Sequence, residues 1–297
     1  MDIILSKMFC LYAFILFGYL TGKLKKGITD HTVILSVLAV NVLMPAKVFN
    51  SFSTYFTVSY IQANYHILLV SLASLAVLHC AGWLVAKLMR GQGIVKGVYE
   101  YTVTISNYGY LGYVLVEGIF GGAVLTDMIL FCMPFSLYTY TIGYLKLTGK
   151  TSIKRLLNPV TMASFAGMAV GLIGLKLPMV ATDVIGSASA CLGPITMLLT
   201  GLTLSEFTIR RMLGDVKVYI MTAIRLVILP LLVYVSFRLL RLDAYMVPAL
   251  VMAAMPSGLN TIIFPKNIGE SPELGAKLAL ITHAVSCVTL PFWLSLL

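Results

Sequence analysis

Long apolar segments are the feature that most restricts how this chain can fold. The sequence divides into roughly ten apolar blocks, each about 18 to 25 residues long. A helix of about 20 residues is long enough to cross the ~30 Å hydrocarbon core of a bilayer. We therefore expect an all-α polytopic membrane protein with ten transmembrane helices and no separate soluble domain. The spans are predicted near 3–22, 32–50, 61–86, 97–120, 124–145, 158–177, 182–204, 216–238, 244–266 and 274–296.

The low charge content leads to the same conclusion. Charged residues make up 11% of the chain, against about 25% in a soluble domain. The first block lacks a small-residue cleavage site and precedes nine further spans, so we interpret it as a helix and not as a signal peptide. The cysteines lie inside predicted spans, and neither they nor the histidines have the spacing of a metal site. No disulfide framework, metal or cofactor is therefore expected.

The net charge of +10 is unevenly distributed along the chain. If the amino terminus is outside, the only lysines and arginines predicted on the outer side are Lys7, Lys176, Arg238 and Arg241. Lysine and arginine concentrate in cytoplasmic loops of membrane proteins. We therefore interpret the charge as a topological signal and not as a nucleic-acid surface, and place both termini outside a cell (plasma or inner) membrane. The predicted inner loops hold Lys23, Lys25, Lys26, Lys87, Arg90, Lys96, Lys146, Lys150, Lys154, Arg155, Arg210, Arg211, Lys217, Lys266 and Lys277.

Ten spans divide into two five-helix halves, 1–150 and 151–297. An odd number of spans per half gives the halves opposite orientations, and inverted repeats of this kind are typical of secondary transporters. The segments NVLMPAKVFNSFS and ACLGPITMLLTGL each carry one proline, and Pro45 and Pro194 are 149 positions apart. The same spacing leads from Asn107 to Pro256. Taken singly, Pro45, Pro194 and Pro230 are better explained as helix kinks.

The predicted fourth and ninth spans are interrupted at mid-depth. The fourth reads TISNYGYLGYVLVEGIFGG and the ninth ALVMAAMPSGLNTIIFPKNIG. Pro256 cannot donate a helix hydrogen bond, and Gly258 permits torsions that other residues resist. Unpaired backbone groups survive in a membrane only where protein or a water-filled cavity satisfies them. We predict that both helices are broken, that they cross at the centre of the repeat, and that helix amino-terminal ends face an anion there.

Several of these segments resemble the auxin efflux carrier family, bacterial permeases related to the PIN auxin exporters of plants. The family's fourth span resembles GNxGFLGLP. The resemblance implies a fold like that of sodium/proton antiporters and bile-acid symporters, with crossed broken helices four and nine. It also implies transport of small organic anions and a homodimer. The matching segments are SNYGYLGY, LLNPVTMASFAGMAVGLIGLKLP, GPITMLLTGLTL, IRLVILPLL and AAMPSGLNTIIFPKNIGESPELGAKLALITHAVSCVTLPFW.

The chain departs from the family's pattern in two places at the fourth span. Tyr113 stands where the family usually has a proline, so the break there rests on Asn107, Gly109 and Gly112. Ser106 stands where the plant exporters have a proline before the asparagine. The resemblance therefore does not identify the substrate.

Neutral polar residues at the two interruptions are the main candidates for substrate binding. The amide of Asn107 both donates and accepts hydrogen bonds, so it fits a carboxylate or the cap of an opened helix. Ser257 and Asn260 offer similar groups on the other half. Tyr108 could wall an apolar substrate or serve only for packing. The candidates at the interruptions are Asn107, Tyr108, Gly109, Pro256, Ser257, Gly258 and Asn260.

Two cations inside predicted spans are further candidates, because a buried charge is rare in a membrane. Lys47 either reaches the outer headgroups or attracts an anion to the cavity mouth. Arg225 either clamps a substrate carboxylate or pairs structurally with a carboxylate or free carbonyls near the crossover.

Three titratable residues are possible proton-coupling groups, namely Glu100, Glu117 and His283. A carboxyl group in a low-dielectric cavity can hold a proton near neutral pH. The paired aspartates of proton-pumping antiporters have no counterpart here.

The leading hypothesis is a secondary transporter for a small organic anion, such as a carboxylate or an auxin-like acid, that works by alternating access around the crossover. The lipid bilayer and the anion are the expected partners. A cation/proton antiporter of related fold and a non-transporting acid sensor are the alternatives. An enzyme is not expected, because no protease or phosphate-binding motif is present.

Overall fold

The computed structural model describes residues 2–25, 32–151, 153–208 and 213–297. Within these ranges the chain forms helices and no strand. Seven continuous helical segments are long and apolar enough to cross a membrane, which makes this a multi-pass membrane protein. They coincide with seven of the predicted spans. They are α1 (Asp2–Leu24), α2–η2–α3 (Thr32–Tyr55), α5 (His66–Leu88), α8–η4–α9 (Gly122–Thr148), α11 (Met179–Ser205), α13–η6–α14 (Val216–Leu239) and α17 (Glu273–Leu294).

Three of these segments contain a π-helical turn. The turn η2 (Ala39–Leu43) ends two residues before Pro45, and η6 (Ile224–Ile228) ends two residues before Pro230, whereas η4 (Thr139–Gly143) follows Pro134 by about one turn. Proline cannot donate the regular helix hydrogen bond, and a wider turn nearby accommodates the loss. These prolines therefore distort their helices without ending them.

The remaining predicted spans are short or interrupted. The helix α10 (Pro159–Ile173) ends at Gly174, whose φ is +68°, and not at residue 177 as predicted. The fourth predicted span consists of α6 (Gly93–Thr104), η3 (Tyr108–Gly112) and α7 (Tyr113–Phe120). The ninth consists of η7 (Asp243–Tyr245), α15 (Met246–Ala254) and α16 (Asn260–Lys266).

The predicted start of the third span at residue 61 is wrong. A separate short helix, α4 (Val58–Asn64), precedes α5. Thr57 caps α4 by accepting a hydrogen bond from the backbone N–H of Tyr60. A second short segment, η5 (Ile153–Leu156), connects the two halves of the chain.

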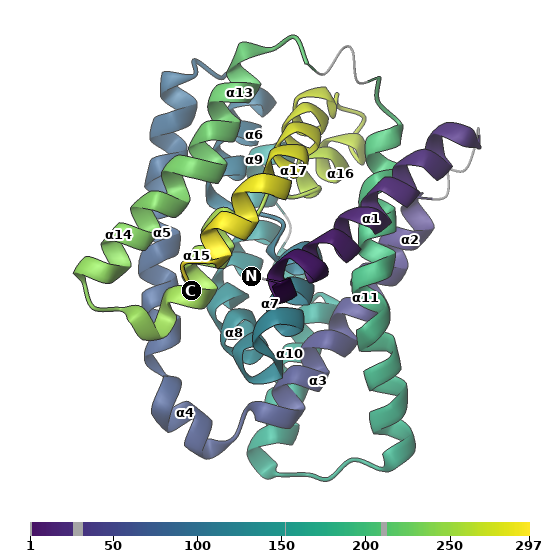
Figure 1. Cartoon of the computed structure of the whole chain (residues 1–297), viewed down its shortest axis with the longest axis vertical. Helices are drawn as coiled ribbons and strands as arrows, with labels where there is room; N and C mark the ends of the chain where they lie inside the picture. The colour runs from purple at the N-terminus through teal and green to yellow at the C-terminus, as the bar shows by residue number, and fades with distance from the viewer. Residues whose placement is uncertain (1, 26–31, 152, 209–212) are drawn as a thin grey trace.

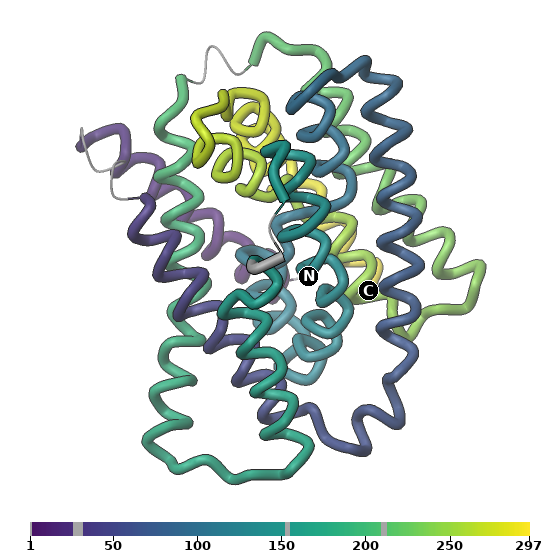
Figure 2. Tube along the Cα trace, turned by 180° about the vertical axis from the view of Figure 1, so that it is seen from behind, coloured from purple at the N-terminus to yellow at the C-terminus, as the bar shows by residue number. Residues whose placement is uncertain are grey.

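The helices pack into two groups, on opposite sides in Figures 1 and 2. In the first group α1 packs along α11, and α3 packs along α10 and α11. A Cβ at Gly201 of α11 would lie 2.6 Å from the backbone nitrogen of Tyr19, so the contact between α1 and α11 depends on glycine. In the second group α5, α6, α8, α13–α14, α15 and α17 pack together. The contacts of α3 with α8 and of α11 with η3 join the two groups.

Candidate functional site

The backbones of the two interrupted helices are paired with each other. Ser106 and Ser257 form an isolated antiparallel β-bridge, and the N–H of Asn107 donates to the carbonyl oxygen of Pro256 at 2.8 Å. Gly258 lies so close that a Cβ there would be 3.3 Å from the carbonyl oxygen of Ser106. These contacts satisfy part of the backbone that the interruptions leave without a helix partner.

The last long helix, α17, holds both interruptions in place. The N–H of Ser257 donates to the Oγ1 atom of Thr282 at 3.0 Å. One residue further on, Nε2 of His283 lies 3.1 Å from Nδ2 of Asn107. Adjacent residues of α17 thus each bind one of the two interruptions.

Arg225, in the π turn η6, binds the carboxyl-terminal ends of α6 and α15. Its side chain is fully buried and donates to three carbonyl oxygens, those of Val103 (2.9 Å), Met252 (2.6 Å) and Met255 (3.0 Å). Carbonyls at a helix end lack helix partners and carry the negative end of the helix dipole. The guanidinium therefore stabilises both ends at once.

The sequence leaves two roles open for Arg225, and in the structure its side chain pairs with free backbone carbonyls. Its three bonds occupy Nε, Nη1 and Nη2, and the residue does not line the cavity described next. A direct clamp on a substrate carboxylate is therefore not what this structure contains.

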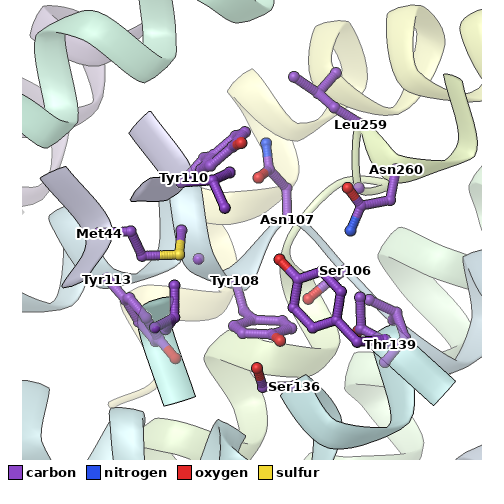
Figure 3. Close-up of a pocket in the computed structure, with 16 residues that line it drawn as sticks. Met44, Ser106, Asn107, Tyr108, Tyr110, Tyr113, Ser136, Thr139, Leu259 and Asn260 are labelled. Atoms are coloured by element: carbon purple, nitrogen blue, oxygen red, sulfur yellow. The ribbon is translucent and has the colours of Figure 1, made fainter. Parts of the chain in front are cut away.

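A cavity of about 70 Å³ lies beside the paired interruptions. By this measure a water molecule needs ~10–15 Å³, so the cavity has room for several water molecules. Among the described residues, no charged side chain lines it. The first interruption contributes Ile105, Ser106, Asn107, Tyr108, Gly109 and Tyr110, and the second contributes Gly258, Leu259 and Asn260. Figure 3 shows Asn107 near the centre of the view and Asn260 to its right, with the ring of Tyr108 below them.

Both asparagines at the cavity are fixed through their amide nitrogens. Nδ2 of Asn260 donates to the hydroxyl of Tyr101 at 3.0 Å, and Nδ2 of Asn107 faces His283. The amide oxygens of the two residues receive no hydrogen bond from the described part of the chain. The cavity is therefore lined by amide, hydroxyl and aromatic groups without a formal charge.

The residues predicted at the two interruptions, and His283, lie at or beside the cavity. Asn107, Tyr108, Gly109, Gly258 and Asn260 line the cavity. Pro256 and Ser257 form the backbone pairing beside it, and His283 contacts Asn107 from behind.

The other charged candidates lie elsewhere, in ion pairs. Lys47 of α3 is 3% exposed and binds Glu117 of α7 at 2.5 Å. Glu100 of α6 pairs with Lys146 and, at 3.8 Å, with Lys96. Lys47, predicted to reach the headgroups or to attract an anion at the cavity mouth, is instead ion-paired and does not line the cavity. The proton-coupling roles of Glu100 and Glu117 stay predictions, and both carboxylates pair with lysines away from the cavity lining.

Sequence reasoning missed the part of the cavity that comes from α8, η4, η2 and α3. Ser136, Thr139 and Tyr140 line one wall, and Val40 and Met44 line another. The run SLYTYT after Pro134 offers a signal, since it places several hydroxyl groups beside a helix distortion. Tyr113, noted only as a departure from a motif, also lines the cavity.

Comparisons with known proteins agree on one class. The sequence profile of the family described as membrane transport protein matches residues 3–150 and 143–294. A protein from Methanothermobacter thermautotrophicus, named an uncharacterized transporter, is 24% identical over 293 residues, which cover 94% of this chain and 93% of the relative. The family match includes both interruptions.

Proposed function

This chain belongs to the membrane transport protein family, that of the auxin efflux carriers, and on this premise we propose that it is a secondary carrier for a small organic anion. The anion is a carboxylate or an auxin-like acid, and transport proceeds by alternating access. One observation carries the proposal. The backbones of two interrupted helices pair through Asn107 and Pro256 at the edge of a cavity that both interruptions line.

The proposed architecture has ten spans, with α10, α6–η3–α7 and α15–α16 as the three beyond the long helices. The interrupted helices are then spans four and nine of two inverted repeats, 1–150 and 151–297. Backbone features support this pairing of halves. Arg90 and Arg241 both have positive φ directly after α5 and α14, and they are 151 positions apart. Gly121 and Gly269, after α7 and α16, are 148 positions apart and also have positive φ.

The proposed orientation has both termini outside the cell. The connection from α5 to α6 and the start of α13 lie at the same end of the molecule, at the top of Figure 1, and carry Lys87, Arg90, Lys96 and Lys217. This end would face the cytoplasm by the positive-inside rule.

The chemistry of the cavity favours an anion over a cation. The helical run η3–α7 begins at Tyr108 beside the cavity, so the positive end of its dipole lies there. No carboxylate among the described residues lines the cavity to hold a cation, and the two candidate carboxylates, Glu100 and Glu117, are paired with lysines. The rings of Tyr108, Tyr110, Tyr113 and Tyr140 supply an apolar wall for the body of an organic acid.

The position of the cavity suits alternating access. Met44 and Val160 come from α3 and α10 of the first group, and Ser136 comes from α8 of the second group. Most of the other lining residues belong to the two interruptions, which lie between the groups. Movement of one group relative to the other would open the cavity first to one side of the membrane and then to the other.

Counterflow in liposomes tests the proposal. Purified protein is reconstituted, loaded with unlabelled acids from a panel of monocarboxylates, dicarboxylates and indole-3-acetate, and supplied with the same acid in labelled form outside. We expect saturable uptake of at least one acid, reduced at least tenfold by Asn107→Ala. The matched control is Asn41→Ala, since Asn41 is exposed and its Nδ2 bonds only the carbonyl oxygen of Val37.

The alternatives give different results in the same vesicles. An acid that raises the thermal stability of the protein but never exchanges across the membrane indicates a sensor. Sodium-dependent pH changes without acid exchange indicate a cation/proton antiporter. Normal exchange by Asn107→Ala would remove Asn107 from the site.

A further inference from the structure

Both ring nitrogens of His283 are hydrogen-bonded, and their partners determine which nitrogen carries the proton when the ring is neutral. Nδ1 lies 2.7 Å from the carbonyl oxygen of Ala279, one turn earlier in α17. A carbonyl oxygen can only accept, so Nδ1 carries the proton in this bond. When His283 is neutral, Nε2 is therefore an acceptor, and the group that faces it at 3.1 Å must be a donor.

This requirement orients the amide of Asn107. The nitrogen Nδ2 turns to His283, and the oxygen Oδ1 turns away from it. The oxygen has no hydrogen-bond partner in the described ranges of the chain, although Asn107 is almost fully buried and lines the cavity. With His283 neutral, Asn107 thus offers the cavity an acceptor, which a carboxylate cannot use.

Adding a proton to His283 reverses the requirement. Both ring nitrogens then donate, and the bond to Asn107 is kept only if the amide turns by about 180° so that Oδ1 faces Nε2. The amide nitrogen then lies on the cavity side, where its N–H groups can donate to a carboxylate. The same rotation about the Cβ–Cγ bond breaks one hydrogen bond and forms another, so the number of hydrogen bonds between the two residues is unchanged.

From this geometry we propose that His283 is the proton-coupling residue of the carrier, acting through Asn107. Binding of a carboxylate favours the donor orientation of Asn107, the donor orientation favours protonated His283, and the acid and one proton are therefore bound together. Linkage is reciprocal, so protonation of His283 tightens carboxylate binding by the same factor. The inference rests on the proposed anion function and specifies its coupling ion.

The surroundings of His283 leave it free of a competing carboxylate. In the described structure the imidazole ring of His283 bonds only Asn107 and the carbonyl oxygen of Ala279, and this buried side chain bonds no acid. On α17 and on the elements packed against it, eight ionisable groups or ion pairs have hydrogen-bond or ionic partners other than the His283 ring. These pairs are Tyr12–Ser286, Cys287–His283 carbonyl, Arg225–Met255 carbonyl, Tyr101–Asn260, Glu100–Lys146, Lys217–Met89 carbonyl, Lys266–Glu206 and Lys277–Glu273.

Calorimetry measures this coupling directly. Binding of acetate, malonate or indole-3-acetate is titrated at pH 8 in two buffers with different ionisation enthalpies, and the difference in heat gives the number of protons taken up per acid. We expect about one proton for the native protein and none for His283→Gln, whose amide can donate to Asn107 at any pH. Between pH 6 and pH 8 the native dissociation constant should rise by up to tenfold per pH unit, as one linked proton requires, and that of His283→Gln should stay flat.

Two controls separate the possible results. Methanesulfonate cannot take up a proton near neutral pH, so uptake of one proton with this ligand assigns the proton to the protein. Asn107→Leu keeps His283 but removes the amide, and any acid that this variant still binds should take up no proton.

Several results would overturn the inference. They are proton uptake that persists in His283→Gln, binding without uptake in the native protein, and uptake that survives Asn107→Leu. If acetate binds without a proton while liposomes still exchange acid, the coupling is wrong and the proposed function stands. Binding of none of the acids, together with no exchange, overturns both.

Discussion

The backbone N–H of Asn107 donates to the carbonyl oxygen of Pro256, 149 positions further along the chain. This one bond joins the two places where a long apolar segment is interrupted. Each interruption leaves carbonyls at the end of one helix and N–H groups at the start of the next. Arg225 donates hydrogen bonds to three of these carbonyls, and Thr282 accepts one from the N–H of Ser257. The N–H groups at the start of η3 lie beside the cavity. The site is thus made of backbone that the helices do not use.

Replacing Arg225 by leucine should destabilise the protein strongly. Each hydrogen bond from a charged donor contributes about 1.5–3 kcal/mol, and three buried carbonyls would lose their partner together. We expect a loss of about 3 kcal/mol or more, seen as a lower melting temperature in detergent. Arg225→Lys should recover only part of the loss, because an ammonium group cannot reach three divergent carbonyls in one plane. An unchanged melting temperature in Arg225→Leu would contradict the capping role.

The ion pair between Lys47 and Glu117 should be a stability element and not part of the transport site. Lys47 is buried and Glu117 is 37% exposed, so Lys47→Met leaves a partly solvated carboxylate and should cost about 1–3 kcal/mol. The double variant Lys47→Met/Glu117→Gln should recover most of that loss, because neither charge is then unpaired. The matched control is the exposed pair of Arg238 and Asp243, where charge removal should leave the melting temperature almost unchanged because water screens the pair. A tenfold loss of counterflow in a stable double variant would show that Lys47 takes part in transport.

The sequence predicts those features of the structure that depend on the hydropathy or the chemistry of a local segment. Seven spans follow from hydropathy, because a bilayer fixes the length of an apolar helix. The gaps after α6 and α15 fall where Asn107 and Pro256 predicted interruptions. These residues disturb a helix through their own chemistry, so a local sequence pattern reveals them.

The contacts that the sequence did not predict are made with groups that no sequence pattern marks. The three acceptors of Arg225 are backbone carbonyls on two other helices, and every residue has such a group. Lys47 and Glu117 are 70 residues apart, so their pairing follows only from the packing of α3 near α7. Thr139 lines the cavity yet bonds the carbonyl of Phe135 like many other threonines in these helices. Only the three-dimensional arrangement distinguishes such residues.

Adding a side chain at Gly258 should separate the two interruptions. A Cβ there would meet the carbonyl oxygen of Ser106 at 3.3 Å, and the larger side chain of valine would also fill part of the cavity. We expect Gly258→Val to cost about 1–3 kcal/mol, as overpacking commonly does, and to abolish counterflow. Gly186→Val in α11 is the control, because a Cβ at that glycine meets no atom within 4 Å. Full counterflow by Gly258→Val would mean that the close approach of the two backbones is not needed for transport.

Thr282→Val isolates the contribution of α17 to the second interruption. The Oγ1 atom of Thr282 donates to the carbonyl of Leu278, as that of Thr141 does to Leu137, but Thr282 alone of the two also accepts the N–H of Ser257. Valine has nearly the same shape, so the variant mainly removes the acceptor and leaves a buried N–H without a partner, at a cost of about 1–3 kcal/mol. Thr141→Val loses only a bond back to its own helix and should change the melting temperature little.

Because Thr282 binds Ser257 while its neighbour His283 binds Asn107, Thr282→Val should also slow counterflow, by loosening one interruption against the other. Equal melting temperatures for the two variants would show that the N–H of Ser257 finds another partner, and that α17 is not needed to hold the second interruption.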